Sequence, residues 1–194
     1  MLEEESIWIK EVLEKADLSN VREVLDVGSS TKEVRTQTQP YIDENIFNPL
    51  RKCNISIYYL DKKKSEGVDL VYDIENVSAD MIGKKFDLVI CCNLLEHVLK
   101  PNKVASFLMD VVERGGYLLV TVPQTYRYHP DPIDTMFRPS MDELISMFAG
   151  LEIIRKATIR IRDRKKYKLT ELIRYLIPFL NWKVNCLFMR KEML

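Results

Sequence analysis

The sequence predicts an α/β fold with a mostly parallel sheet covered by helices. Apolar runs typical of strands alternate with segments of helical periodicity through the first 150 residues, which is the pattern of consecutive βα units. The run KFDLVICCN (85–93) is apolar almost throughout, as expected of a central strand buried on both faces. At 194 residues the chain is long enough for one sizeable domain, and we expect a single one over 1–194.

Within this domain we expect an N-terminal helix in 1–20, a core in 21–150, and C-terminal strands in 151–194 that carry a basic and apolar helical insertion. Ser140 and Glu143 form a predicted capping box for the helix that follows them. Strands are expected at 23–28, 54–61, 68–74, 85–93, 117–123, 151–161 and 182–190. Helices are expected at 6–16, from about 41 onwards, from Pro101 to a cap at Gly115, at 141–150 and at 169–180.

The composition and the charge balance exclude several classes of protein. The 29 basic residues match the 29 acidic ones, so no overall field favours a nucleic acid. Four cysteines without a C-x-x-C pair and only two histidines predict reduced thiols and no metal site, and Cys91 and Cys92 are expected in the core. The start of the chain lacks the features of a signal peptide, and no stretch approaches the roughly 18 apolar residues of a membrane span. We therefore expect a cytoplasmic protein.

Carboxylates stand at the ends of the first three predicted strands. Asp26, Asp61 and Asp73 close these strands, and Gly28 is the single glycine in the turn after the first. Ligands of an open parallel sheet bind at the carboxyl ends of its strands. Carboxylates and a glycine-poor turn would repel a pyrophosphate, whereas they would attract a ligand with an ammonium and a sulfonium group. S-adenosylmethionine carries both cations and no phosphate.

Five motifs follow one another in the order and at the spacings of a known superfamily. VLDVGSS, YYLDKK, DLVYDIEN, FDLVICCNLLEHVLKP and GGYLLVTVP together resemble class I S-adenosylmethionine-dependent methyltransferases over roughly residues 21–150. The resemblance implies a Rossmann-like three-layer sandwich with a mostly parallel seven-stranded sheet, whose antiparallel last strand falls at 182–190. It also implies S-adenosylmethionine as the cofactor and methyl transfer as the activity.

The resemblance further implies how residues are arranged around the cofactor. Asp26, Gly28 and Ser29 would flank its methionine part, and the hydroxyls of Ser29 and Ser30 would bond its amino-acid end where many relatives carry further glycines. Asp61 would hold the ribose hydroxyls. The remaining positions would contact the adenine or close the floor under the sulfonium: Lys62, Asp73 and Ile74 at the adenine, and Asn93 and Leu94 under the sulfonium.

The stretch YRYHPDPIDTMFRPS (126–140) follows the fifth predicted strand and is expected to border the acceptor. Its three prolines stiffen a loop at the ligand-binding edge of the sheet. Methyl transfer from a sulfonium depends mainly on alignment, and it needs a base where the acceptor must lose a proton. We expect His129 to be this base. Asp134 is a further catalytic candidate, and the expected acceptor contacts are Tyr128, Asp131 and Arg138.

Two interpretations of this loop are open. Asp131 or Asp134 would orient His129 or bond a substrate hydroxyl, while Arg138 would hold an anionic group of the acceptor. In the structural alternative, Asp134 and Arg138 pair at i,i+4 and His129 caps a turn. His97, in LLEHV, is the second catalytic candidate, and within the superfamily it more often organises the loop beside the cofactor.

The loops TQTQPYIDENIFNPL (36–50) and YHPDPIDTMFRPS (128–140) resemble those of methyltransferases associated with the biosynthesis of cell-envelope polysaccharides and other glycans. This narrower likeness implies a small-molecule or glycan-type acceptor and O-methylation of a sugar hydroxyl. Three alternatives are open: an NAD-dependent oxidoreductase, a nucleic-acid methyltransferase, and a methyltransferase-like binding or scaffold protein without catalysis.

A basic segment precedes the last predicted strand. Eight basic residues and one acidic residue lie between Arg155 and Lys168, directly before an apolar stretch. This pattern over 155–180 would suit peripheral contact with anionic lipid or with a lipid-linked acceptor. The alternative is a solvated strand edge followed by a helix that packs on the core or on the second subunit of a homodimer.

Overall fold

The computed structural model describes residues 1–162, 169–177 and 180–193. In these ranges, strands join into a single seven-stranded sheet in the order β3-β2-β1-β4-β5-β7-β6. The strands are β1 (Glu23–Val27), β2 (Ser56–Asp61), β3 (Leu70–Val71), β4 (Phe86–Cys92), β5 (Val112–Thr125), β6 (Leu151–Arg160) and β7 (Lys183–Lys191). The predicted α/β sheet is therefore confirmed.

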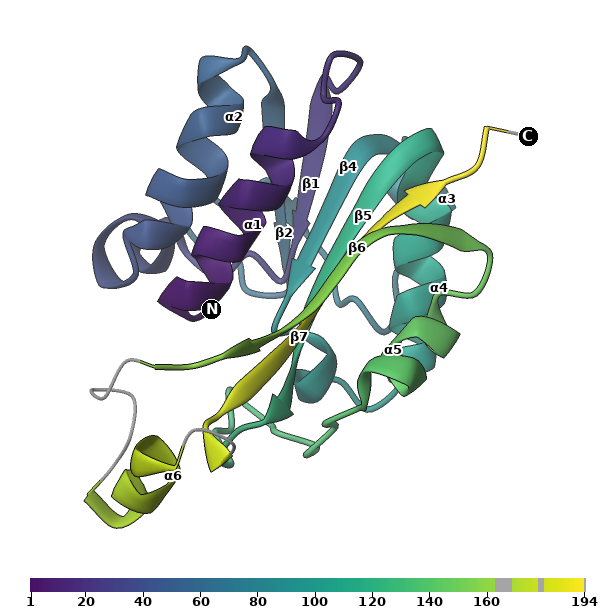
Figure 1. The fold of residues 1–194 in the computed structure, drawn as a ribbon. Coiled ribbons are helices and arrows are strands. Elements are labelled where there is room, and N and C mark those ends of the chain that lie inside the picture. The colour runs from purple at the N-terminus through teal and green to yellow at the C-terminus, as the bar shows by residue number, and fades with distance from the viewer. Residues whose placement is uncertain (163–168, 178–179, 194) are drawn as a thin grey trace.

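The helices lie on both faces of this sheet, with α1 and α2 on one side and α3, α4 and α5 on the other (Figure 1). They are α1 (Glu3–Lys15), α2 (Asn48–Lys52), α3 (Ala79–Ile82), α4 (Pro101–Val111), α5 (Met141–Met147) and α6 (Leu172–Leu176). Shorter helical turns are η1 (Val34–Thr38), η2 (Asp43–Phe47), η3 (Leu95–His97) and η5 (Leu169–Glu171). The arrangement is the expected three-layer sandwich.

Strand direction follows the expected pattern. Strand β1 runs parallel to both β2 and β4, with Leu25 opposite Tyr58 on one side and Val89 on the other. Strand β7 is antiparallel to both of its neighbours, β5 and β6. The chain moves outward from β1 to β3 and then returns to β4 on the other side of β1. The strand order thus reverses between β1 and β4, where open parallel sheets bind ligands.

The core consists of two apolar layers, one on each face of the sheet. Because side chains alternate along a strand, Val89 of β4 packs with the α4 layer and its neighbour Ile90 packs with the α1 layer. Helix α4 contributes Val104, Leu108 and Val111 to the first layer, all fully buried. This double burial explains why β4 is apolar almost throughout, as the sequence predicts.

Two predicted boundaries are wrong. Strand β3 has only two residues, so it ends before Asp73, whose backbone carbonyl accepts a hydrogen bond from the Val77 N–H in the following turn. Gly115 does not cap a helix, because α4 passes directly into β5 at Val112. Val112 pairs with Phe86, the register then shifts, and Gly115 with its φ of +77° lies in this irregular part of β5.

The C-terminal third agrees with the remaining predictions. The capping box of α5 is present, since the Glu143 N–H donates to Ser140 Oγ at 3.2 Å and the Ser140 N–H donates to the Glu143 carboxylate at 2.7 Å. Part of the basic segment, residues 163–168, and the predicted break at Pro178 lie outside the described residues. In the described part of the chain, no helix combines the length and apolar character needed to cross a membrane.

Candidate functional site

A cavity of about 510 Å³ lies at the carboxyl ends of β1, β2 and β4. Its lining includes every residue that the sequence predicts for the cofactor: Asp26, Gly28, Ser29, Ser30, Asp61, Lys62, Asp73, Ile74, Asn93 and Leu94. Of the predicted acceptor residues, His97, His129 and Asp131 also line the cavity, whereas Tyr128, Asp134 and Arg138 lie outside its lining. The structure thus brings both predicted groups of residues to one cavity.

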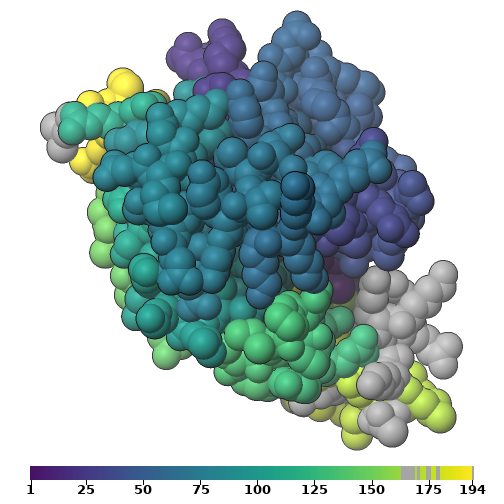
Figure 2. Space-filling view, turned by 180° about the vertical axis from the view of Figure 1, so that it is seen from behind, coloured from purple at the N-terminus to yellow at the C-terminus, as the bar shows by residue number. Residues whose placement is uncertain are grey.

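The loop after β5 lies against the segment after β2 at the surface. In Figure 2 the green surface of this loop lies beside the blue surface of the first half of the chain. Lys63 Nζ lies 3.2 Å from Asp131 Oδ1, an ion pair that joins the two segments. Because both side chains are largely exposed, this pair contributes little to stability and mainly marks where the acceptor loop meets the cofactor end.

The turn after β1 has no spare N–H groups for a phosphate. The N–H groups of Gly28 and Ser29 both donate to the Leu60 carbonyl, at 2.9 and 3.0 Å. The next N–H, that of Ser30, donates to Asp61 Oδ2 at 2.9 Å. A pyrophosphate loop needs free backbone donors, and here three successive donors are already bonded to the protein.

Glycine is required at one position of this turn. Gly28 has a φ of +77°, and a Cβ there would lie 3.0–3.3 Å from the side chain of Leu94. Ser30 also has a positive φ, +56°, in the left-handed region that non-glycine residues rarely adopt. The turn therefore keeps the backbone shape of a glycine-rich loop, with a serine held in a strained conformation.

Arg35 holds this turn from beneath. Its guanidinium donates to the carbonyls of Ser29 and Ser30, both at 2.8 Å, and to that of Gly67 at 2.6 Å. The same group lies 3.8 Å from the centroid of the Tyr59 ring. Arg35 is almost fully buried, so its charge is desolvated and its hydrogen bonds fix the carbonyls firmly. No local pattern in the sequence indicates this role.

Asp26 is a buried carboxylate in the same part of the cavity. It is 7% exposed, and this burial raises its pKa to about 7, with the nearby Arg35 acting in the opposite direction and Asp61 adding to the rise. A buried carboxyl group of this kind gains a partner when a cationic ligand binds. The ammonium group of S-adenosylmethionine is such a ligand.

Backbone groups fix the two carboxylates expected at the nucleoside. Asp61 accepts one hydrogen bond on each oxygen, from the N–H of Ser30 and from that of Lys63, both at 2.9 Å. Asp73 accepts from the backbone N–H of Glu75 at 3.1 Å and, in addition, from the side-chain Nδ2 of Asn76 at 2.7 Å. Each oxygen keeps a second lone pair, so both carboxylates are oriented and can still accept from a ligand hydroxyl or amine.

Helix α1 supports the floor of the cavity through Glu5. The Asn93 amide donates to both carboxylate oxygens of Glu5 at 2.9 Å, and the Thr121 hydroxyl donates to the same group. Glu5 is fully buried, and Asn93 has a φ of +51°. The first turn of α1 therefore helps to fix the residue expected under the sulfonium, a support that the sequence analysis missed.

His129 is held by the acceptor loop in a defined tautomer. Its Nδ1 lies 3.0 Å from the Arg127 carbonyl and 3.1 Å from Asp134 Oδ2. Both neighbours are acceptors, so Nδ1 carries the proton and Nε2 keeps a lone pair. Burial lowers the pKa of His129 below its ordinary value, which favours the neutral ring.

Asp134 makes the contacts expected in both interpretations of this loop. It pairs with Arg138 at 2.7 Å, as the structural alternative predicts, and it also accepts the His129 N–H at 3.0 Å. Although burial alone would raise its pKa, hydrogen bonds from Arg138, His129 and Met136 bring the pKa down to about 2. Asp134 thus stays ionised and orients His129.

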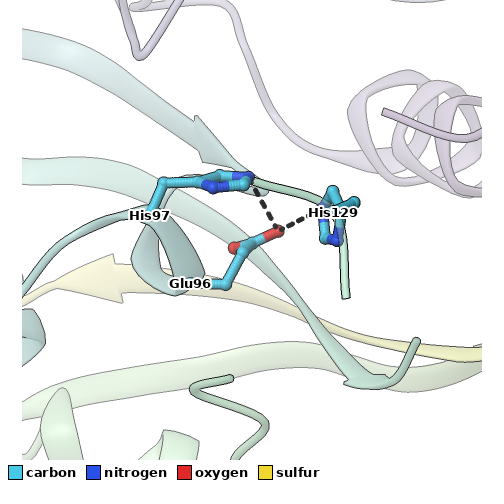
Figure 3. A group of neighbouring side chains, drawn as sticks. All are labelled: Glu96, His97 and His129. Carbon is cyan, nitrogen blue, oxygen red and sulfur yellow. Dashed lines mark ion pairs between the residues drawn. The ribbon is translucent and has the colours of Figure 1, made fainter. Parts of the chain in front are cut away.

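Glu96 is the chemically most unusual group at this end of the cavity. It is 0% exposed, and neither carboxylate oxygen has a hydrogen-bond partner among the described residues. Burial raises its pKa to about 8. Figure 3 shows the carboxylate between the rings of His97 and His129, to which dashed lines run from one of its oxygens. No local pattern in LLEHV indicates a role for Glu96.

Donor atoms of Glu96, His97 and His129 lie within 4.8 Å of one another. Around a zinc ion with bonds of about 2.0–2.2 Å, donor atoms lie only about 3.4 Å apart, so this spacing is wider than that of a formed metal centre. The sequence-based expectation that the protein has no metal site stays a prediction.

The comparison with known families agrees with this geometry. Residues 25–120 match the model of a family described as a methyltransferase domain. These residues are a methyltransferase domain. The protein is accordingly an enzyme that uses S-adenosylmethionine as its methyl donor. A search of curated protein sequences gives no match to the chain.

Solved structures share the fold of this methyltransferase at low sequence identity. Coclaurine N-methyltransferase, bound to N-methylheliamine and S-adenosylhomocysteine, has a TM-score of 0.62 and 13% identity over 96% of this chain and 72% of its own. Magnesium protoporphyrin IX methyltransferase from Synechocystis PCC 6803, with bound S-adenosylmethionine, has a TM-score of 0.57 and 13% identity, over 98% of this chain and 79% of its own. The cyclase SpnF has a TM-score of 0.60 and 18% identity, over 95% of this chain and 80% of its own. At such low identity, the structural likeness establishes the fold and leaves the acceptor open.

Proposed function

We propose that this methyltransferase transfers its methyl group to a hydroxyl of a small-molecule or glycan-type acceptor, with a sugar hydroxyl as the first candidate. The neutral imidazole of His129 carries the proposal, because His129 lines the cavity and its Nδ1 is bonded to the Arg127 carbonyl, which leaves the lone pair on Nε2. A hydroxyl must lose its proton on methylation, so a positioned base of this kind suits an oxygen acceptor.

The cavity divides the proposed roles between its two ends. The ten residues from Asp26 to Leu94 would hold S-adenosylmethionine as the sequence predicts, with Asp61 on the ribose and Asn93 under the sulfonium. His129 would act as the base, with Asp134 orienting it and His97 beside it. Asp131 and Tyr128 would contact the acceptor at the rim, and Arg138 would act through Asp134 or on an anionic group.

Transfer itself is an in-line displacement at the methyl carbon. S-adenosylmethionine supplies an activated methyl group when it is bound. The chain's own contribution is to fix the cofactor through Asp61 and Asn93, to align the acceptor oxygen, and to hold its proton at Nε2 of His129. Tyr126, which lines the cavity and meets His129 edge-on at 5.0 Å between ring centroids, gives this end an aromatic wall.

The similar fold of SpnF, a cyclase by name, shows that the fold alone does not decide the activity. The alternative of a binding protein without methyl transfer nevertheless disagrees with the family match over residues 25–120. The glycine-poor turn first suggested this alternative. It is now a weaker reason to expect a loss of catalysis, since Gly28 and Ser30 keep the positive φ values of a glycine-rich turn. Nucleic-acid methylation, contact of residues 155–180 with a membrane, homodimer formation and a cytoplasmic location stay predictions from the sequence alone.

Calorimetry and a turnover assay test the proposal together. We expect S-adenosylmethionine and S-adenosylhomocysteine to bind and NAD not to bind. Release of S-adenosylhomocysteine is then followed with sugars, glycans and simple phenols as acceptors, and a sugar should give the strongest signal. Absence of cofactor binding at millimolar concentration would overturn the proposal, as would NAD binding. Cofactor binding together with turnover on amines alone would replace the oxygen acceptor with a nitrogen one.

A further inference from the structure

Glu96, His97 and His129 form a closed cluster of three proton-binding groups beside the cavity. Glu96 Oε1 lies 3.9 Å from Nε2 of His97 and 4.0 Å from Nε2 of His129. The two rings also meet each other edge-on, with 5.0 Å between centroids. Glu96 and His97 belong to η3 after β4, whereas His129 belongs to the loop after β5, so the fold brings the cluster together (Figure 3).

Both imidazoles present a lone pair to Glu96. Nδ1 of His97 lies 2.5 Å from the Ile133 carbonyl, and Nδ1 of His129 lies 3.0 Å from the Arg127 carbonyl. A carbonyl only accepts, so each Nδ1 carries a proton and each Nε2 is unprotonated in the neutral ring. A buried carboxyl group therefore faces two proton acceptors, and neither of its oxygens has a hydrogen-bond partner among the described residues.

A buried carboxylate of this kind requires a proton or a cation nearby. An unpaired charge at 0% exposure is strongly disfavoured, so Glu96 takes up a proton more readily than an exposed glutamate does. When it is protonated, its O–H is within a short movement of either Nε2. When it is ionised, it favours the positive form of the His129 ring. The protonation state of Glu96 thus changes how readily Nε2 of His129 takes up a proton.

We propose that Glu96 is the proton partner of His129. The proposal rests on the proposed function, because it assumes that His129 takes a proton from the acceptor. Ionised Glu96 strengthens His129 as a base and receives the proton from it. Protonated Glu96 directs its O–H at the Nε2 lone pair and blocks the base. Glu96 is a positioning residue in this scheme, since it acts on the acceptor only through His129.

The proton and the electrons balance in each step. The bond between sulfur and the methyl carbon breaks and leaves its electron pair on sulfur, which gives neutral S-adenosylhomocysteine. The acceptor oxygen forms the new bond to the methyl carbon and loses its proton to Nε2 of His129. The proton then passes from Nε2 to Oε1 of Glu96, which forms a carboxylic acid. Before the next turnover it returns to Nε2 and passes from the partly exposed His129 ring to solvent, which leaves Glu96 ionised again.

Charged groups on the neighbouring elements change how readily Glu96 ionises. Arg138 of the acceptor loop and the N-terminal ammonium favour the ionised form of Glu96, whereas Glu5 of α1 opposes it. Cys91 of β4 also faces Glu96, whose charge raises the pKa of that thiol in addition to the larger effect of burial. Asp134 is already ionised and bound to Arg138, so it fixes Nδ1–H and does not compete for the proton.

The protein offers an unusually clean test, because its only two histidines are both in the cluster. Heteronuclear NMR of the imidazoles in the full chain, with and without S-adenosylmethionine, gives the tautomer of each ring and the change in its chemical shifts between pH 6 and 10. In the wild type we expect both rings in the Nδ1–H form and one common step near pH 8, where Glu96 ionises. The variant Glu96→Gln should lose this step.

The matched control is Glu152→Gln, which removes an exposed carboxyl group on β6 and should leave both titrations unchanged. If Glu96→Gln does not fold, the carboxyl carbons of the wild-type glutamates are followed instead, and one must titrate near pH 8. Rings without a step near pH 8, a step that persists in Glu96→Gln, or an Nε2–H tautomer would overturn the proposal. Stoichiometric bound metal would also overturn it. Calorimetry with S-adenosylmethionine on the same samples tests the proposed function separately.

Discussion

The two ends of the cavity are built in different ways. At the cofactor end, backbone groups make most of the contacts, with the N–H groups of Gly28 and Ser30 bonded to the end of β2. At the acceptor end, a side chain takes part in each contact, with the Asp134 carboxylate joining the His129 N–H to the Arg138 guanidinium. The first construction follows from the register of parallel strands, and the second depends on how one loop folds back on η3.

Because of this difference, we expect the two ends to respond differently to substitution. A carboxylate at a strand end is fixed by backbone hydrogen bonds that most substitutions of neighbouring side chains leave in place. A side-chain network such as that of His129, Asp134 and Glu96 changes as a unit, because each member sets the protonation of the next. The predictions below test this contrast.

The largest effect is expected from His129→Ala at the acceptor end. Turnover of S-adenosylmethionine on a responding acceptor should fall by roughly 10²–10⁴-fold, the usual contribution of a general base. Cofactor affinity measured by calorimetry should be unchanged, since the backbone-built end is intact. Wild-type turnover in the variant would remove His129 from the mechanism. A parallel loss of cofactor affinity would show that the two ends of the cavity do not act independently.

Asp61→Ala should act at the cofactor end alone. Loss of the ribose hydrogen bonds is expected to weaken S-adenosylmethionine binding by about 1–3 kcal/mol, which corresponds to roughly 5–150-fold in Kd. The control Asp80→Ala removes an exposed carboxylate on α3 and should bind the cofactor as the wild type does. Equal affinities of Asp61→Ala and the wild type would count against the assigned ribose contact.

The pH dependence of cofactor binding should report Asp26. Its pKa of about 7 means that the carboxyl group is mostly protonated at pH 6, so binding of an ammonium must first ionise it. Kd for S-adenosylmethionine should therefore fall by roughly tenfold between pH 6 and pH 7.5. Asp26→Asn should show a flat profile over this range, and a flat wild-type profile would argue against contact between Asp26 and the ammonium.

The same carboxyl group has a defined effect on folding. Because its folded pKa lies above its unfolded value of about 3.9, its contribution to stability is present at low pH and is lost as pH rises from about 4 to 7. The free energy of unfolding of Asp26→Asn relative to the cofactor-free wild type should thus increase over this interval, which urea denaturation at several pH values can measure.

The smallest effect is expected from Ser30→Gly. Relief of the positive φ contributes about 1–2 kcal/mol, and the added freedom of glycine in the unfolded chain opposes it by about 0.5–1 kcal/mol. The free energy of unfolding should rise by about 1 kcal/mol or less. Ser29→Gly is the matched control, because without a strained φ it should only destabilise. A loss of stability in Ser30→Gly would show that its hydroxyl matters more than its backbone.

The fold was largely predictable because its signals are local. The apolar run of β4, the pattern of β1 and the capping box at Ser140 each depend on residues adjacent in the chain. The failures were places where pairing overrode a local signal. Gly115 resembled a helix cap, yet Val112 already pairs with Phe86, and β3 stops before Asp73 because only two of its residues pair with β2.

The strand ends, and with them the residues expected to hold the cofactor, could be read from the sequence, since parallel strands bring Asp26, Asp61 and Asn93 to one edge of the sheet whatever the side chains around them do. The roles of Arg35, Glu5 and Glu96 depend on contacts made by the folded chain. Arg35 bonds Gly67 from 32 residues away, Glu5 bonds Thr121 from 116 residues away, and Glu96 meets His129 from the other side of β5. The burial that sets the pKa of Glu96 belongs to the packed fold and to no segment of the sequence.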